Sequence, residues 1–403
     1  MSMISYETSI NMLELLSLAP TRQEKVFISD TLGRILAEDI VAPDNYPRFA
    51  TSAMDGYAII HADQEWGEIE IDGDNPAGSD IVDIVTGGKC IKTFTGSKMP
   101  QGSDTLIPIE NVTAEGNAIK INESVAKGFS IRPIAESYTK GEILIKKGTK
   151  VGFAEIGVMA GVEKVMVDVA QRPRIAVIST GSEILDIGEA AKTDSQIRST
   201  NHITIEAIAK MAGADVVQLG VIGDDKEAIM QTFENALASA DIVVSTGGVS
   251  VGDYDFVKDI VPALGADVIY KGVKIKPGQH IMLAQKEGKM ILALPGFAYS
   301  CTVTFILYGI PLIGRMLGKS HSLNIIEARL KEPFTKRSKK SEFTACNLSF
   351  EDGSYWVDFH NKKIGSSAIL TNILGASALM LSGEDDSNLD SGMAVNVIPL
   401  DIF

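Results

Sequence analysis

The spacing of apolar residues changes along the chain, and each change predicts a different kind of structure. Residues 6–19 place apolar side chains on one broad stripe, which predicts an amphipathic helix, and residues 24–36 continue toward a second short helix. Two prolines in VAPDNYPRF end this pattern and predict a boundary near residue 44. From 45 to 138, short runs such as CIKTFTG and AIKINES alternate with turn residues, which predicts a small β-rich domain.

After the β-rich segment, residues 142–170 have a helix–strand pattern, and we expect this segment to return and pack with the N-terminal helices. The strand-like runs RIAVIST, VVQLGVI and DIVVST then alternate with helical segments near 201–212, 225–239 and 255–264. This alternation predicts parallel βαβ units, whose ligands bind beyond the carboxyl ends of the strands. The apolar stretch at 300–314 is too short to span a membrane and predicts a buried helix.

The last 84 residues or so alternate apolar and polar positions in SYWVDFH, SALMLSG and AVNVIPL, which predicts a small antiparallel, barrel-like β domain. The fold class is therefore a multidomain α/β protein. The expected domains are an N-terminal helical or linker domain (1–44 plus 139–171), a β-rich domain (45–138), an α/β domain with a parallel-type sheet (172–318) and a C-terminal β domain (319–403).

Charge and cysteine content narrow the function. The formal net charge of −15 repels polyphosphate backbones, and the only basic cluster is KRSKK at 336–340, which argues against nucleic-acid binding. The three cysteines lie far apart and match no zinc spacing, so reduced core thiols are expected. The N-terminus has no basic region before its short apolar stretch, so we expect no signal peptide, no membrane association and a cytoplasmic location.

A glycine-rich stretch, STGGVSVGDYD, follows the third predicted strand and has the composition of an anion cradle. Glycine permits positive φ and close backbone approach, so amide groups can point at an anion while hydroxyls add donors. The stretch lacks the Gly-Lys-Ser/Thr ending of a P-loop and the GxGxxG spacing. The residues expected to bind substrate here are Ser245, Thr246, Gly247, Gly248, Ser250 and Gly252.

Acidic residues follow several predicted strands of the same domain. The candidates to hold Mg²⁺, which bridges carboxylates to substrate phosphates, are Glu183, Asp224, Asp225, Asp253 and Asp255. Each acid taken alone is explained as well by helix capping or a solvated turn. In KIKPGQH, Lys274 and Lys276 add positive charge suited to a phosphate or oxyanion, although exposed surface lysines are the simpler reading of either.

Six motifs together resemble one family. RFATSAMDGYAI, TGSKMPQG, STGSEIL, STGGVSVGDYD, KPG and LPG occur in this order over nearly the whole chain and resemble the molybdopterin molybdenumtransferases, which include the gephyrin E domain. The resemblance implies an elongated homodimer of four domains, with a molybdopterin-binding α/β domain. It also implies that molybdate and adenylylated molybdopterin react, assisted by Mg²⁺, to give molybdenum cofactor and AMP.

Carried over to this sequence, the resemblance assigns roles by position. Asp55 and Thr95 would be catalytic and reach over the partner subunit's cleft from the β-rich domain. Glu183, Asp224 and Asp255 would be catalytic and hold the metal at the pterin-phosphate site. The oxyanion pocket would contain catalytic Lys276 and the substrate-binding residues Lys274, Pro277, Ser300 and Ser366. Implied partners are a molybdopterin adenylyltransferase and apo molybdoenzymes.

The chain departs from the family pattern at several positions. LPGFAYS replaces LPGNPxS, so Phe297, Ala298 and Tyr299 stand where the family has other residues. Phe297 is either an apolar wall of the pocket or, with Tyr299, ordinary core. Ser137 stands at an expected acid, Gly272 at an expected lysine that Lys271 or Lys274 must replace, and Lys339 or Lys340 near an expected arginine. These changes keep two alternatives open, a scaffold or pterin-binding protein of the same fold and a hydrolase of a nucleotide pyrophosphate.

Overall fold

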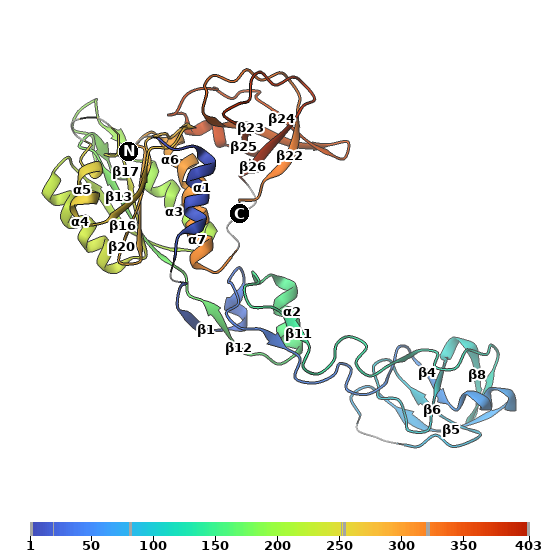
Figure 1. The fold of residues 1–403 in the computed structure, drawn as a ribbon. Helices are drawn as coiled ribbons and strands as arrows, with labels where there is room; N and C mark the ends of the chain where they lie inside the picture. The colour runs from blue at the N-terminus through green and yellow to red at the C-terminus, as the bar shows by residue number, and fades with distance from the viewer. Residues whose placement is uncertain are drawn as a thin grey trace.

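The chain forms four structural units arranged in an elongated molecule (Figure 1). The computed structural model describes residues 3–18, 20–79, 83–250, 252, 255–319 and 323–400. An α/β unit and a barrel lie together at one end, a small linker unit leads away from them, and a β-rich domain lies at the far end (Figure 1). None of the helices in these described ranges is both long enough and apolar enough to cross a membrane.

A six-stranded sheet forms the centre of the α/β unit, in the order β16-β13-β17-β21-β20-β18. The first four strands in this order are parallel, whereas β20 is antiparallel to both of its neighbours. The predicted parallel sheet is therefore mixed, because β20 and β21 are joined by a two-residue turn in which Glu287 and Gly288 both have positive φ. The strands are β13 (Arg174–Thr180), β16 (Asp215–Ile222), β17 (Ile242–Thr246), β18 (Asp267–Lys271), β20 (Met282–Lys286) and β21 (Lys289–Leu294).

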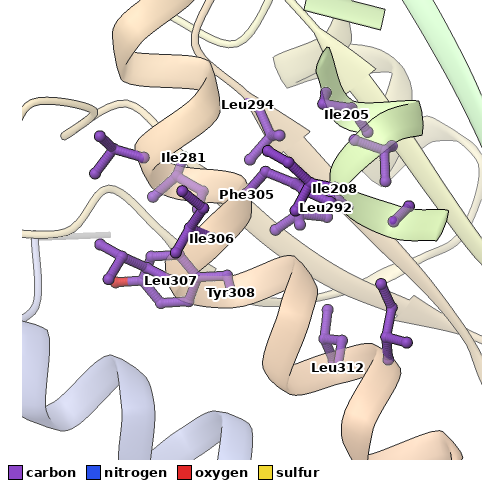
Figure 2. Packing of buried hydrophobic residues seen from close by; sticks show 14 of the residues in the cluster. Ile205, Ile208, Ile281, Leu292, Leu294, Phe305, Ile306, Leu307, Tyr308 and Leu312 are labelled. Atoms are coloured by element: carbon purple, nitrogen blue, oxygen red, sulfur yellow. The ribbon is translucent and has the colours of Figure 1, made fainter. Parts of the chain in front are cut away.

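Helices cover both faces of this sheet, as the alternation predicted. Apolar side chains of α4 and α5 pack on one face, and those of α3, α6 and α7 pack on the other. Figure 2 shows the second face, where Ile205 and Ile208 meet Leu292 and Phe305. The predicted buried helix at 300–314 is confirmed as a run that includes a π-helical turn at Phe305–Gly309. The helices are α3 (Asn201–Ala212), α4 (Lys226–Ser239), α5 (Val257–Ala263), α6 (Ala298–Thr304) and α7 (Ile310–Met316).

The N-terminal helix α1 (Tyr6–Leu15) packs on the α/β unit. Its Leu13 is fully buried in the same core, and the Ser9 and Tyr308 hydroxyls lie 2.8 Å apart. The Arg315 guanidinium donates to the carbonyls of Leu13 and Leu16 at the helix end. These contacts attach the N-terminal helix to the helices of residues 298–316.

The second predicted helix, at 24–36, is wrong. This segment forms strand β1 (Gln23–Phe27) and a 3₁₀ turn (Ile28–Thr31), because side chains in β1 alternate between the two faces and Val26 pairs with Val167 of β12. Residues 142–170 do return to the N-terminal part, but the expected packing against N-terminal helices is wrong: they pair with the N-terminal strands, whereas α1 packs on the α/β unit. The linker unit contains β2 (Ile40–Val41), β11 (Ile143–Ile145), α2 (Phe153–Gly161) and β12 (Met166–Ala170), and pairs β2 with β11 and β1 with β12.

Two adjacent stretches of chain connect the linker unit to the β-rich domain. The Tyr46 and Tyr138 rings stack with their centroids 5.5 Å apart, and the Tyr46 amide donates to the Tyr138 carbonyl at 3.0 Å. Beyond them, β3 (Thr51–Ser52) pairs with β10 (Ile131–Arg132). We call the β-rich domain the arm, and its attachment is therefore a pair of strands rather than a single strand.

The arm contains a six-stranded sheet in the order β7-β4-β6-β5-β9-β8, which confirms the predicted β-rich character. Its core contains Tyr57, Ile59, Ile107 and Ile119. The strands are β4 (Gly56–Ile59), β5 (Ile69–Asn75), β6 (Lys89–Thr93), β7 (Thr105–Pro108), β8 (Val112–Glu115) and β9 (Ala118–Ile121).

The C-terminal unit is a closed five-stranded barrel, which confirms the barrel-like prediction, but the expected all-antiparallel pairing is wrong because β22 and β24 pair in parallel. Its order is β23-β24-β22-β26-β25, and β25 pairs back onto β23. A short strand of the α/β unit, β19 (Ile275–Lys276), pairs with the start of β23 and joins the two units. The barrel strands are β22 (Ile326–Leu330), β23 (Ser341–Glu351), β24 (Ser354–Asp358), β25 (Ser377–Ser382) and β26 (Ala394–Pro399).

Candidate active site

A cavity of about 810 Å³ lies beyond the carboxyl ends of β13 and β17, where an α/β sheet binds its ligands. The pairing of β14 (Ile184–Leu185) with β15 (Ile197–Arg198) helps form one wall. The predicted residues that line this larger cavity are Glu183, Asp224, Thr246, Gly247, Gly248, Ser250, Gly252 and Asp255. Ser245 does not line it, since it is fully buried within β17.

The glycines after β17 have the backbone that the anion cradle requires. Gly247 and Gly248 have φ values of 90° and 67°. A Cβ on Gly247 would lie 2.9 Å from the Thr180 carbonyl oxygen, so only glycine fits this close approach. The two glycine loops therefore pack directly against each other at the cavity wall.

We expect Gly247→Ala to lower the free energy of unfolding by about 2 kcal/mol or more, because it adds backbone strain and a steric clash. Gly265→Ala is the matched control, since Gly265 has a φ of 75° and open space around its Cβ position. Urea denaturation of both variants measures the difference. Equal destabilisation would show that the contact with Thr180 is unimportant.

Two carboxylates of the larger cavity accept backbone hydrogen bonds, Asp224 from the neighbouring loop after β13 and Asp255 from its own loop. Asp224 Oδ2 accepts from the Ser182 amide at 3.0 Å, and Asp255 Oδ2 accepts from the Gly252 amide at 2.7 Å. Within the described ranges, no group of three His, Cys, Asp or Glu residues could hold a metal ion. The expected ligand set of Glu183, Asp224 and Asp255 is thus not gathered as a ready-made metal site, and Asp253 lies outside the described residues.

A second cavity of about 350 Å³ lies between the α/β unit and the barrel. It brings together the predicted residues Lys276, Pro277, Ser300 and Ser366. Lys274 does not line it and is exposed at the surface. Neither Lys271 nor Lys274 lines either of these two cavities, which argues against each as a replacement for the lysine expected at Gly272.

The smaller cavity also contains charges that the motifs did not reveal. Glu342, only 4% exposed, lies with its Oε1 3.5 Å from Lys276 Nζ and accepts from the Arg337 amide at 3.2 Å. Lys340 lines the same cavity, whereas Lys339 does not. The only sequence signal for Glu342 was its place beside the KRSKK cluster, and the β19–β23 pairing is what brings it to Lys276.

The two cavities adjoin, and their shared lining residues within the described chain are His280, Pro295 and Phe297. Phe297 is 63% exposed and forms an apolar wall, so the expectation that it turns inward is wrong. Tyr299 does turn inward: its hydroxyl donates to the Phe343 carbonyl at 2.9 Å and accepts from the Ala345 amide at 2.8 Å. The LPGFAYS departure therefore places one aromatic ring in the core and one at the site.

Ser300 lies deep in the smaller cavity, where its amide donates to the Ser367 carbonyl at 3.1 Å. We expect Ser300→Ala to raise the molybdate concentration needed for half-maximal activity about fivefold, since one hydroxyl donor to a charged ligand is lost. Phe297→Asn is the comparison and should change that concentration much less. If Ser300→Ala were silent and Phe297→Asn improved molybdate use, this cavity would not be the oxyanion site.

Asp55 and Thr95 lie together in the arm, and neither lines either cavity. Asp55 Oδ1 accepts from the Thr95 amide at 2.8 Å and from its hydroxyl at 2.7 Å. These two hydrogen bonds lower the pKa of Asp55, so its carboxylate is charged at neutral pH. Glu136 pairs with Arg132 at 2.5 Å in the arm's attachment, next to Ser137.

A third cavity, of about 240 Å³, lies near Arg34, Lys150, Arg172 and Lys210. Its basic side chains have a structural explanation, because residues at the carboxyl ends of α3 and α7 also line it. Cations are stabilising beside the carbonyls at a helix carboxyl end. The cluster therefore does not indicate a second active site.

Comparison with known proteins agrees with this architecture. Residues 4–162 match the family described as MoeA N-terminal region (domain I and II), and residues 176–315 match the probable molybdopterin binding domain. The molybdopterin molybdenumtransferase of a Nostoc species is 32% identical over 384 residues, covering 92% of this chain and 87% of the relative. The enzyme of that name from Staphylococcus aureus strain MRSA252 is 33% identical over 380 residues, covering 93% and 90%.

A solved structure extends the comparison to the whole fold. The molybdopterin biosynthesis moea protein of Pyrococcus horikosii superposes with a TM-score of 0.84 at 27% identity, covering 99% of both chains. The sequence relatives, the two matched regions and this superposition agree, and the resemblance drawn from the motifs is confirmed. This chain belongs to the molybdopterin molybdenumtransferase family.

Proposed function

We propose that this chain transfers molybdenum from molybdate to adenylylated molybdopterin and releases AMP. The observation that carries the proposal is the pair of adjoining cavities, one with an anion cradle and one with a lysine. The larger cavity suits the pterin and its phosphates, and the smaller one suits the oxyanion. Molybdate then lies beside the dithiolene sulfurs when both substrates are bound.

The residues act mainly through charge and position. Lys276 would hold the oxyanion as a point charge, while the glycine-loop amides bind the phosphates. A preorganised site of this kind stabilises charge that develops as AMP leaves. No protein nucleophile is needed for the transfer.

Mg²⁺ remains part of the proposal, but with fewer protein ligands than the sequence predicted. Mg²⁺ keeps several waters and is commonly held by one or two carboxylates plus substrate phosphates. Asp224 and Asp255 fit this role, because the loop amides bind only one oxygen of each in the described chain. When bound, the ion would neutralise charge on the phosphates, and Glu183 would add negative potential nearby.

We also propose that the chain is a homodimer. The linker unit exposes Phe153, Val165 and Met166 by 89%, 54% and 43%, which supports a buried contact in an assembly. A partner would also bring Asp55 and Thr95 of its arm to this chain's larger cavity. The domain division by residues 1–44 plus 139–171, 45–138, 172–318 and 319–403 stays part of this proposal, except that helix α1 packs on the α/β unit and not on the linker unit.

The direct test is reconstitution of an apo molybdoenzyme by the purified chain, adenylylated molybdopterin, Mg²⁺ and molybdate. Active molybdoenzyme with release of AMP supports the transferase. Tight pterin binding without insertion supports the scaffold, and AMP without insertion supports the pyrophosphate hydrolase. We propose a cytoplasmic location and exchange with a molybdopterin adenylyltransferase and apo molybdoenzymes.

A further inference from the structure

The boundary between the two cavities is poor in polar side chains. The shared lining residues in the described chain are Pro295, Phe297 and His280, and only His280 has a side chain that forms hydrogen bonds. Any oxyanion that reaches from one cavity into the other therefore meets this imidazole. Partial burial and the nearby charge of Lys340 lower the pKa of His280, and the negative charge of Asp255 opposes this more weakly.

A chain of hydrogen bonds sets which nitrogen of His280 carries the proton. The Lys340 ammonium group can only donate, so it binds Gln279 Oε1 and leaves the Gln279 amide nitrogen facing His280. That amide donates to His280 Nε2 at 2.9 Å. In the neutral ring Nε2 is then an acceptor, and the proton lies on Nδ1.

We propose that His280 binds an oxyanion oxygen through Nδ1–H at the boundary between the two cavities, with Gln279 and Lys340 as positioning residues that fix its tautomer. The inference rests on the proposed function, in which two oxyanions meet there. The oxygen comes either from molybdate or from the phosphate of the adenylyl group. Lys340 belongs to the barrel and His280 to the α/β unit, so the contact also depends on how these units are joined.

Nuclear magnetic resonance on the full chain with ¹⁵N-labelled histidine tests the proposal without turnover. Long-range proton–nitrogen spectra assign the tautomer, and the missing signal in His280→Asn identifies His280 among the five histidines. We expect the Nδ1–H form and a shift of the His280 signals on adding molybdate alone or AMP alone, which tells the two sources apart. The Nε2–H form, or no response to either anion, overturns the proposal.

Three variants separate ligand binding from structural support. His280→Ala should weaken binding of the responding anion about tenfold, since a donor to a charged group is lost. His280→Asn should keep most of the affinity, because its amide nitrogen takes the place of Nδ1. Gln279→Met should reduce the Nδ1–H population of His280 and weaken binding severalfold in proportion to that loss.

The outcomes also separate this inference from the proposed function. A folded His280→Asn as weak as His280→Ala would overturn the role of Nδ1–H. A responding His280 in a chain that inserts no molybdenum leaves the inference standing and removes the transferase. Normal molybdenum insertion by a chain whose His280 signals do not respond to either anion supports the transferase and overturns the inference about His280.

Discussion

Lys276→Ala should lower kcat/KM for molybdate at least about tenfold, because a hydrogen bond to a charged group is worth about 1.5 to 3 kcal/mol and the Lys276 side chain is only partly exposed. Two effects add. The cation that attracts the oxyanion is lost, and the carboxylate of Glu342, 3.5 Å away and 4% exposed, is left to repel it. Insertion assays at varied molybdate concentration measure the change.

Glu342→Gln is the matched control for this result. Its amide keeps an oxygen that can accept from the Arg337 amide, but it removes the negative charge from the anion cavity. We expect this variant to need less molybdate than the parent chain. The double variant Lys276→Ala, Glu342→Gln should recover part of the loss. A Glu342→Gln chain that needs more molybdate would contradict the placement of the oxyanion beside Lys276.

Asp55→Ala and Asp255→Asn should each lose at least about 100-fold in molybdenum insertion when assayed alone, because each removes a carboxylate from the proposed charge-stabilising machinery. Refolding the two variants together should restore about a quarter of the parent activity, since in a symmetric dimer only one site in four combines an intact arm with an intact cavity. Insertion assays on the mixture measure the recovery.

Mixtures of each variant with itself are the controls and should stay inactive. If verified mixed dimers show no recovery, Asp55 and Asp255 act in the active site of one and the same chain, or the arm does not contribute to the active site of the partner subunit. Sedimentation of the parent chain adds an independent check. An active monomer would contradict the shared site.

Local patterns predicted the α/β unit best, because strand and helix periods there act over a few residues. RIAVIST became β13 and DIVVST became β17, and the glycines after them have the positive φ that the anion cradle requires. The error at 24–36 has a different origin. β1 forms because β12 lies beside it, and Val26 and its partner Val167 are 141 residues apart in the sequence.

Site residues that belong to a motif could be predicted from the sequence, whereas residues that reach the site only through tertiary packing could not. Motifs identified Lys276 and Ser300, and both line the smaller cavity. Glu342 and His280 belong to no motif with a stated role, whereas Lys340 stands near an arginine that the family pattern predicts. Glu342 and Lys340 reach the site from the barrel. Ser245 shows the converse, since its place in a motif suggested a ligand contact that its burial in β17 prevents.

The paired attachment of the arm has a mechanical consequence. A single flexible tether would deliver its tip by diffusion, at an effective concentration set by tether length. Two strands bridged at Tyr46 and Tyr138, and again at Thr51 and Arg132, resist bending and twisting more than one strand does. The arm therefore behaves as a rigid connection. Removing equal numbers of residues from both strands would displace Asp55 by a fixed distance and would not change its effective concentration as shortening a flexible tether does.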